Sequence, residues 1–298
     1  MTDAVIRPIV KPIEEVKGRS LWADAWRRLK RNRAAVASLA LLAIIAVVCV
    51  VTPMVSPIAI DDVFWDSVSS PPDFAGGHYF GTDDNGRDLF VRTMYGGRIS
   101  LTVGLVATLV SLVIGVTWGA TAGFLGGRID GVMMRIVDIL YSVPFIFFVI
   151  MLTVVFGRNI VLIYVAIGAV SWLDMSRIVR GQTMSLKRRE FVEAAHAGGV
   201  RGAAIVRRHI IPNCLGPVVI YITLTVPNVI LTESFLSFLG LGVQEPATSW
   251  GVLIADGARI MDSSPWALIF PATFLAVTLG CFSFIGDGLR DALDPKDR

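Results

Sequence analysis

Long apolar runs, separated by short polar and glycine-containing segments, occupy most of this chain. Six of the runs are candidate helices: residues 34–51, extended to 55, and residues 99–125, 136–156, 160–173, 216–235 and 266–285. The first run carries no charge. As a helix it is about 27 Å long, close to the hydrocarbon thickness of about 30 Å. The pattern therefore predicts an all-α, polytopic membrane protein with six transmembrane helices.

Composition supports this fold class, and the charge distribution orients it. The chain is 54% hydrophobic with a mean hydropathy of +0.67, which is too apolar for an ordinary soluble domain. Six spans place both termini on one side, and if that side is cytoplasmic, 22 of the 27 Lys and Arg residues are cytoplasmic too. The predicted organisation is a cytoplasmic N-terminal segment, 1–33, and a six-span domain, 34–298. Its loops 56–98 and 242–265 are then extracytoplasmic, and its loop 177–215 is cytoplasmic.

Other chemistry is sparse in the sequence. The net charge of +3 follows from membrane topology and gives no support to nucleic-acid binding. Three cysteines in or beside the spans predict no disulfide framework, and the three histidines lack a second ligand at metal-binding spacing. No lysine stands in a Gly-Lys-Ser/Thr phosphate loop. We therefore expect no metal site, no bound cofactor and no ATPase activity in this chain.

The segment 190–213, EFVEAAHAGGVRGAAIVRRHIIPN, is charged and rich in glycine. Each basic residue at mid-membrane costs roughly 2.5 to 3.5 kcal/mol, so this segment faces water. Helix-forming residues at 190–197 predict a short helix that stops at the pair Gly198-Gly199. A small, alanine-rich helix that projects from a membrane protein can serve as a docking site for another protein.

The order Glu193-Ala194-Ala195, three residues, Gly199, then Ile211-Pro212 resembles the EAA loop of bacterial ABC importer permeases. The resemblance implies a coupling helix that sits in a groove of a cytoplasmic ATPase and transmits its closure to the spans. The residues it assigns to coupling are Glu190, Phe191, Glu193, Ala194, Ala195, Gly199 and Pro212. A simpler alternative is a basic loop that obeys the positive-inside rule and contacts anionic lipid.

The loop after the first span contains GTDDNGRDLF at 81–90, followed by YGGRISL at 95–101. Both resemble the C-type permeases of peptide importers, and they suggest Asp83, Arg87 and Asp88 as contacts for a substrate-delivering partner. The alternative is that Asp and Gly form turns here through local hydrogen bonds. A calcium loop is rejected because Arg87 stands where an oxygen ligand is needed.

Several polar and small residues stand in or beside the spans. Small residues at four-residue spacing, Gly115, Gly119, Gly123 and Gly127, continue Ser100, Gly104 and Thr108 and favour close helix packing, more probably within the subunit than between subunits. Pro144, Pro227 and Pro271 each remove a backbone bond within a span and suggest moving parts. Asp138 and Asp174 are expected to pair with Arg135 and Arg177 one helical turn away. Glu233 and Asn228 remain candidates for the translocation path or a gate.

The resemblance to oligopeptide-importer C-type permeases covers nearly the whole chain, including WLDMSRIVRGQT from 172, LGLGVQEP from 239 and IGDGLRDALDPKDR at the end. It implies the translocation subunit of an ATP-driven importer of short peptides in the bacterial inner membrane. Implied partners are a second permease, two ATPase subunits holding ATP and Mg, an extracytoplasmic peptide-binding protein and membrane lipid. Permeases for dipeptides, glutathione or nickel remain alternatives. An ion-coupled transporter is less favoured, since no clear pair of broken helices is present.

Overall fold

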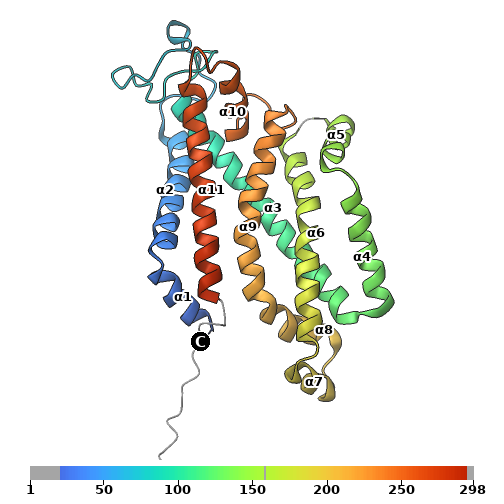
Figure 1. Cartoon of the computed structure of the whole chain (residues 1–298). Coiled ribbons are helices and arrows are strands. Elements are labelled where there is room, and N and C mark those ends of the chain that lie inside the picture. The colour runs from blue at the N-terminus through green and yellow to red at the C-terminus, as the bar shows by residue number, and fades with distance from the viewer. Residues whose placement is uncertain (1–20, 158, 294–298) are drawn as a thin grey trace, which may run out of the picture.

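The computed structural model describes residues 21–157 and 159–293, and its regular structure there is helical apart from three isolated antiparallel bridges (Figure 1). Residues 1–20 of the predicted N-terminal segment and residues 294–298 of the C-terminal block lie outside the described residues. Five helices are long and apolar enough to cross a membrane, or six if one bent pair counts as a span. The predicted all-α membrane fold is confirmed.

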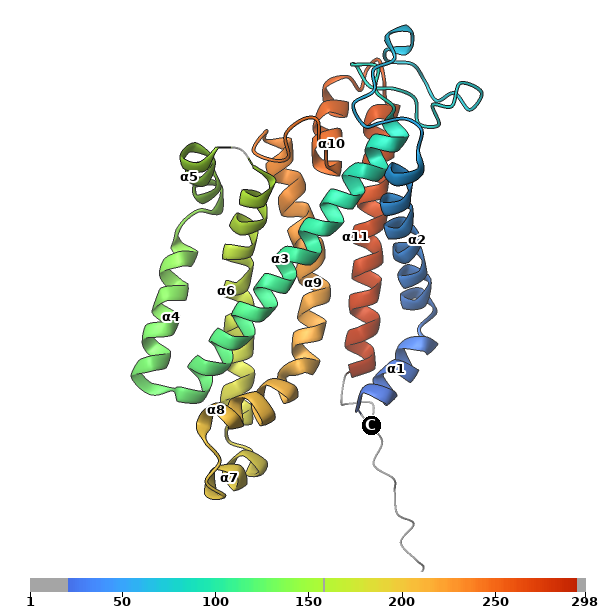
Figure 2. The same ribbon diagram turned by 180° about the vertical axis from the view of Figure 1, so that it is seen from behind.

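The helices, in chain order, are α1 Leu21–Arg31, α2 Arg33–Val55, the 3-10 turn η1 Trp65–Ser67, α3 Leu89–Leu125, α4 Gly127–Ser142, α5 Phe145–Phe156, α6 Ile160–Leu186, α7 Glu190–Ala197, α8 Gly202–Ile205, the π-helical turn η2 Val206–Ile210, α9 Ile211–Phe238, α10 Trp250–Arg259 and α11 Trp266–Leu293. Helix α3 crosses the bundle obliquely and packs against α2, α6 and α9 (Figure 2).

The bundle has two distinct ends. One, here called the α7 end, carries α1, α7, α8 and the last described residues of α11 (Figure 1). The other, the α10 end, carries α10 and the long loop between α2 and α3. Both ends of the described chain therefore lie at the α7 end. This placement agrees with an even number of crossings.

Glycines bring α3 and α6 into close contact. A Cβ atom on Gly119 would collide with the Ser176 carbonyl oxygen, and one on Gly123 would lie 2.8 Å from the Arg180 carbonyl oxygen. Gly115 makes the same kind of approach, whereas a Cβ on Gly127 would meet nothing within 4 Å. Gly115, Gly119 and Gly123 thus pack within the subunit, as the sequence favours. Gly127, the last of the predicted series, takes no part in this contact.

The predicted span 136–156 is not one straight helix. Helix α4 ends at Ser142, α5 begins at Phe145, and the two axes differ by 79°. Pro144 has no N–H to continue the hydrogen-bond ladder, and Val143 before it is extended with φ −80° and ψ 118°. Pro227 and Pro271, by contrast, lie inside the continuous helices α9 and α11.

Helical structure in two of the predicted loops was not anticipated. Helix α3 begins at Leu89, ten residues before the predicted start, because the Asp88 side chain accepts a hydrogen bond from the Val91 N–H at 2.9 Å and caps it. Helix α10 lies within the predicted loop 242–265, and its Trp250 is fully buried. The loop 56–98 is therefore shorter than predicted, and much of its polar sequence packs onto helices.

Candidate functional site

Helix α7 has the predicted bounds and projects from the α7 end (Figures 1 and 2). Glu190 and Glu193 stand in its first turn, where carboxylates stabilise the positive end of the helix dipole. It ends in a Schellman motif: the Val200 N–H donates to the Ala195 carbonyl at 3.1 Å and the Gly199 N–H to the His196 carbonyl at 3.0 Å. Gly199 has φ +77°, a left-handed conformation that suits glycine.

Val192 anchors α7 to the spans. Val192 is 3% exposed and packs in a cluster with residues of α3, α6, α8 and α9, among them Val179 and Cys214. Glu190, Phe191, Glu193 and Ala194 are exposed, while Ala195 is half-buried and packs against the same cluster. Val192 therefore puts α7 in direct packing contact with α6 and α9.

Helix α7 is also linked to α9 along the chain. Residues 202–238 form one continuous helical segment through the π-turn η2. The Ile211 N–H donates to the Val206 carbonyl five residues back, and Pro212 follows without an N–H of its own. The Asn213 side-chain amide donates to the His209 carbonyl at 2.6 Å. Pro212 thus lies at the start of α9, in the connection from the exposed helix to a central span.

A hollow of about 610 Å³ separates α7 from the end of α3, with Phe124, Leu125, Lys187, Val192, Glu193, His196 and Ala197 around it. Its floor is apolar, and Glu193 and His196 supply polar groups. Lys187 Nζ donates to the Phe124 carbonyl at 2.5 Å and so ties the end of α6 to α3. The hollow can accept an apolar side chain with polar groups beside it.

At the α10 end, Asp83 and Arg87 hold the long loop in place. Asp83 Oδ1 accepts from the Arg87 N–H at 2.8 Å, and Asp83 Oδ2 accepts from Arg87 Nε at 2.8 Å. The Arg87 guanidinium donates also to Glu245 Oε1 at 2.7 Å, which joins this loop to the segment between α9 and α10. Asp88 caps α3 and accepts from His78 Nδ1 at 2.8 Å.

All three predicted contact residues of this loop are buried: Asp83 is 6% exposed, Arg87 8% and Asp88 2%. Apart from the bond from Arg87 to Glu245, their hydrogen bonds are local turn and cap bonds, the alternative that the sequence left open. The sequence did not indicate Glu245, because nothing in the spacing relates it to Arg87, 158 positions earlier.

Acid is expected to weaken the Arg87–Glu245 contact. The hydrogen bond from Arg87 holds the pKa of Glu245 below its ordinary value. A depressed folded-state pKa stabilises the fold above the unfolded pKa of about 4.3, and this contribution is lost as the pH falls through the folded pKa. Because the Glu245 side chain is 64% exposed, the effect is below about 1 kcal/mol.

The measurement is the rate at which pepsin cleaves loop 56–88, compared between the natural protein and the variant Glu245→Gln. The variant should be cut faster at pH 5, and the difference should shrink as the pH falls below the unfolded-state pKa of about 4.3 and vanish below the lowered folded-state pKa of Glu245. A difference that does not change as the pH is lowered contradicts the assignment.

A family model described as "Binding-protein-dependent transport system inner membrane component" matches residues 115–298, and one described as "N-terminal TM domain of oligopeptide transport permease C" matches residues 20–72. The chain belongs to this permease family. It is an inner-membrane permease subunit of an ABC importer.

Curated relatives match this permease along nearly its whole length. The oligopeptide transport system permease protein OppC of Escherichia coli K12 is 64% identical over 284 residues, 95% of this chain and 94% of the relative. OppC of Haemophilus influenzae is 57% identical over 295 residues, 98% and 95% of the two chains. The dipeptide transport system permease protein DppC of Bacillus subtilis is 46% identical over 276 residues, 92% and 86%.

A solved structure of the MetNI methionine ABC transporter, in an inward-facing conformation, has a similar fold. Its TM-score is 0.57 at 20% identity, and the match covers 69% of this chain and 96% of that one. At this identity the likeness supports the fold alone.

In this permease, Glu233 lies at a junction of three helices. It is fully buried on α9, and its carboxylate accepts from Ser100 of α3 at 3.0 Å and from Ser237 at 2.7 Å. Ser249, the N-cap of α10, donates to Ser237 at 3.3 Å, and the Trp250 N–H donates to Ser100 Oγ at 3.3 Å. Glu233 therefore faces α3 and α10 and helps to fix α10 in position.

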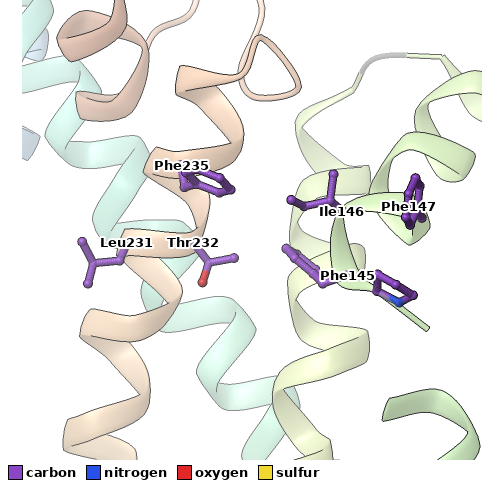
Figure 3. A pocket seen from close by; sticks show the side chains of 7 residues that line it. Phe145, Ile146, Phe147, Leu231, Thr232 and Phe235 are labelled. Atoms are coloured by element: carbon purple, nitrogen blue, oxygen red, sulfur yellow. The ribbon is translucent and has the colours of Figure 1, made fainter. Parts of the chain in front are cut away.

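Asn228 points elsewhere. It is exposed on α9, on the face that also carries Leu224, Leu231 and Phe235. Next to this face, a hollow of about 610 Å³ separates α9 from α5, with Phe235 and Thr232 across from Phe145 and Ile146 (Figure 3). The structure thus does not bring the two candidate path residues together.

The predicted ion pairs within α4 and α6 are wrong. Arg177 of α6 pairs with Asp138 of α4 at 2.9 Å, and Asp174 accepts from Tyr141 at 2.7 Å. These bonds run between helices because the carboxylates face the neighbouring helix, a geometry that spacing along one helix does not reveal. A third link, Arg180 to Asp130 at 2.6 Å, was not anticipated.

Proposed function

We propose that this permease passes short peptides across the inner membrane, with α7 seated against an ATPase subunit. The observation that carries the coupling role is that α7 is anchored at one residue and exposed at others: Val192 is buried among the spans, and Glu190, Phe191, Glu193 and Ala194 are exposed. The peptide substrate is supported by the names of relatives at 46% to 64% identity.

In the complex that we propose, three kinds of protein partner join this chain in the lipid membrane. ATP and Mg bind to two cytoplasmic ATPase subunits, a second permease completes the pathway, and an extracytoplasmic protein delivers the peptide. The exposed face of α9, with Asn228 among apolar side chains, suits the wall of a pathway shared with the second permease. For the delivering protein, the exposed Asp61, Trp65 and Asp84 beside the buried Arg87 are the available contacts.

The test is uptake of labelled tripeptides by the whole complex in vesicles, with unlabelled competitors. We expect longer peptides to compete and dipeptides, glutathione and nickel to compete poorly. Competition only by dipeptides, by glutathione or by nickel would replace the oligopeptide with that substrate.

The proposed orientation places the α7 end in the cytoplasm, since that arrangement makes 22 of 27 basic residues cytoplasmic. Cysteine replacing Asp84 should react with an impermeant thiol reagent in cells with a permeabilised outer membrane, and cysteine replacing His196 should react only after lysis. Both positions are exposed, and the native Cys49, Cys214 and Cys281 are buried, so background labelling is low. The opposite labelling pattern reverses the topology.

A further inference from the structure

Helix α1 presents a basic face at the α7 end. Its inner side packs on α11: Ala25 is 5% exposed, and a Cβ on Gly288 would lie 3.4 Å from Leu29. The outer side carries the exposed residues Trp26, Arg27, Lys30 and Arg31, continued by Arg33 at the start of α2. Trp26 is 54% exposed, an unusual position for so large an apolar surface unless something covers it.

The location of α1 is set by the span that follows it. Only Asn32 separates α1 from α2, whose 23 residues extend about 34 Å as a helix, slightly more than the hydrocarbon thickness of about 30 Å. The start of α2, and with it α1, therefore lies at the level of the lipid headgroups. Tryptophan is enriched at this level because its ring is apolar and its N–H is polar.

The charges of this face are not neutralised by described carboxylates. Among residues 21–157 and 159–293, no acidic side chain forms an ion pair with Arg27, Lys30, Arg31 or Arg33. Lys30 Nζ lies 5.1 Å from the Trp26 ring centroid, a cation–π contact that holds the ammonium beside the ring. An anion that also offers an apolar surface would satisfy both groups.

We propose that Trp26, Arg27, Lys30 and Arg31 form a binding site for an anionic phospholipid, with the phosphate between the basic side chains and the acyl chains along Trp26 and α2. The exposed apolar residues of α2, such as Leu39 and Ile44, continue the surface that acyl chains would cover. In both views α1 lies beneath α2 and α11, away from α7 beneath α6, so the lipid site and the ATPase surface are separate (Figures 1 and 2).

The first test titrates the purified complex with phosphatidylglycerol or phosphatidylcholine and counts bound lipids by native mass spectrometry. The variant Arg27→Gln/Lys30→Gln/Arg31→Gln should bind phosphatidylglycerol more weakly by about fivefold per charge, or about a hundredfold together, with phosphatidylcholine unaffected. The matched control Arg201→Gln/Arg207→Gln/Arg208→Gln removes three exposed charges at the same end of the bundle. An equal loss in the control means diffuse charge attraction and overturns the site.

A second measurement leaves Arg27, Lys30 and Arg31 unchanged and follows the fluorescence of Trp26. In vesicles of brominated phosphatidylglycerol or brominated phosphatidylcholine, the fluorescence of Trp26 is isolated as the difference between the natural chain and Trp26→Phe. Quenching should be stronger with the anionic lipid. Equal quenching by both lipids shows that α1 has no preference for anionic headgroups, and no quenching by either shows that something other than lipid covers Trp26; both results overturn the proposal.

Discussion

Gly199→Trp is expected to abolish peptide uptake while the permease remains folded in the membrane. A Cβ at Gly199 meets nothing within 4 Å, so the indole does not collide with this chain. The left-handed φ of +77° costs a non-glycine residue about 1–2 kcal/mol, which frays the end of α7 but leaves the spans intact. The indole would, however, stand beside the surface that we assign to the ATPase. ATP-driven peptide uptake and the amount of inserted protein are the two measurements.

Two control variants distinguish the effect of the indole's size at Gly199 from the effect of backbone strain. Gly240 ends α9 in the same Schellman motif, with φ +76° and open space at its Cβ, so Gly240→Trp carries the same strain at the α10 end. Gly199→Asn tests the conformation alone, because asparagine tolerates the left-handed region. We expect both to retain most uptake. If Gly199→Trp transports normally, α7 is not the coupling element, and if Gly199→Asn is equally inactive, the cap geometry matters rather than the surface.

Glu233→Gln should retain ATP-driven uptake in vesicles without a proton gradient. Glutamine keeps an oxygen that accepts from Ser100 and occupies nearly the same volume, so the junction of α3, α9 and α10 stays hydrogen-bonded. A proton carrier at this position would lose its titrating group and stop coupled uptake. The ABC assignment would be contradicted if vesicles with the natural complex showed no ATP-driven uptake and imported peptide when a proton gradient was imposed.

Glu233→Leu provides the contrast. It removes the acceptor for the hydroxyls of Ser100 and Ser237 in a fully buried site, which costs about 1–3 kcal/mol for each group left without a partner. We expect lower thermal stability and weaker protection of the α10 backbone in hydrogen exchange. Loss of uptake in the leucine variant with retention in the glutamine variant identifies Glu233 as a positioning residue.

The sequence predicted features that depend on local composition. The bounds of α7 follow from helix formers ended by two glycines, and the spans follow from uninterrupted apolar runs. Features that depend on tertiary contacts were missed: α10 is held by the burial of Trp250, and α3 extends to Leu89 because the polar loop folds back on it. The ion pairs were wrong for the same reason, since Arg177 reaches across to Asp138 on another helix. At Pro144 the sequence suggested a lost backbone bond and a moving part, but not the change of helix direction by 79°.

The π-turn at 206–210 makes the connection between α7 and α9 respond differently to a lost residue and to an added one. Each residue of an α-helix rotates the chain by about 100°, and a π-turn accommodates one residue more than a regular turn of the same ladder. Deleting one residue here would convert the π-turn into a regular α-turn and keep the register of the flanking helices, so α7 would stay nearly in place. Inserting one residue into the regular helix after it would instead rotate α7 by about 100° about the axis of α9 and turn its exposed face away from a docked partner. This segment is therefore expected to tolerate a one-residue deletion in the π-turn much better than a one-residue insertion.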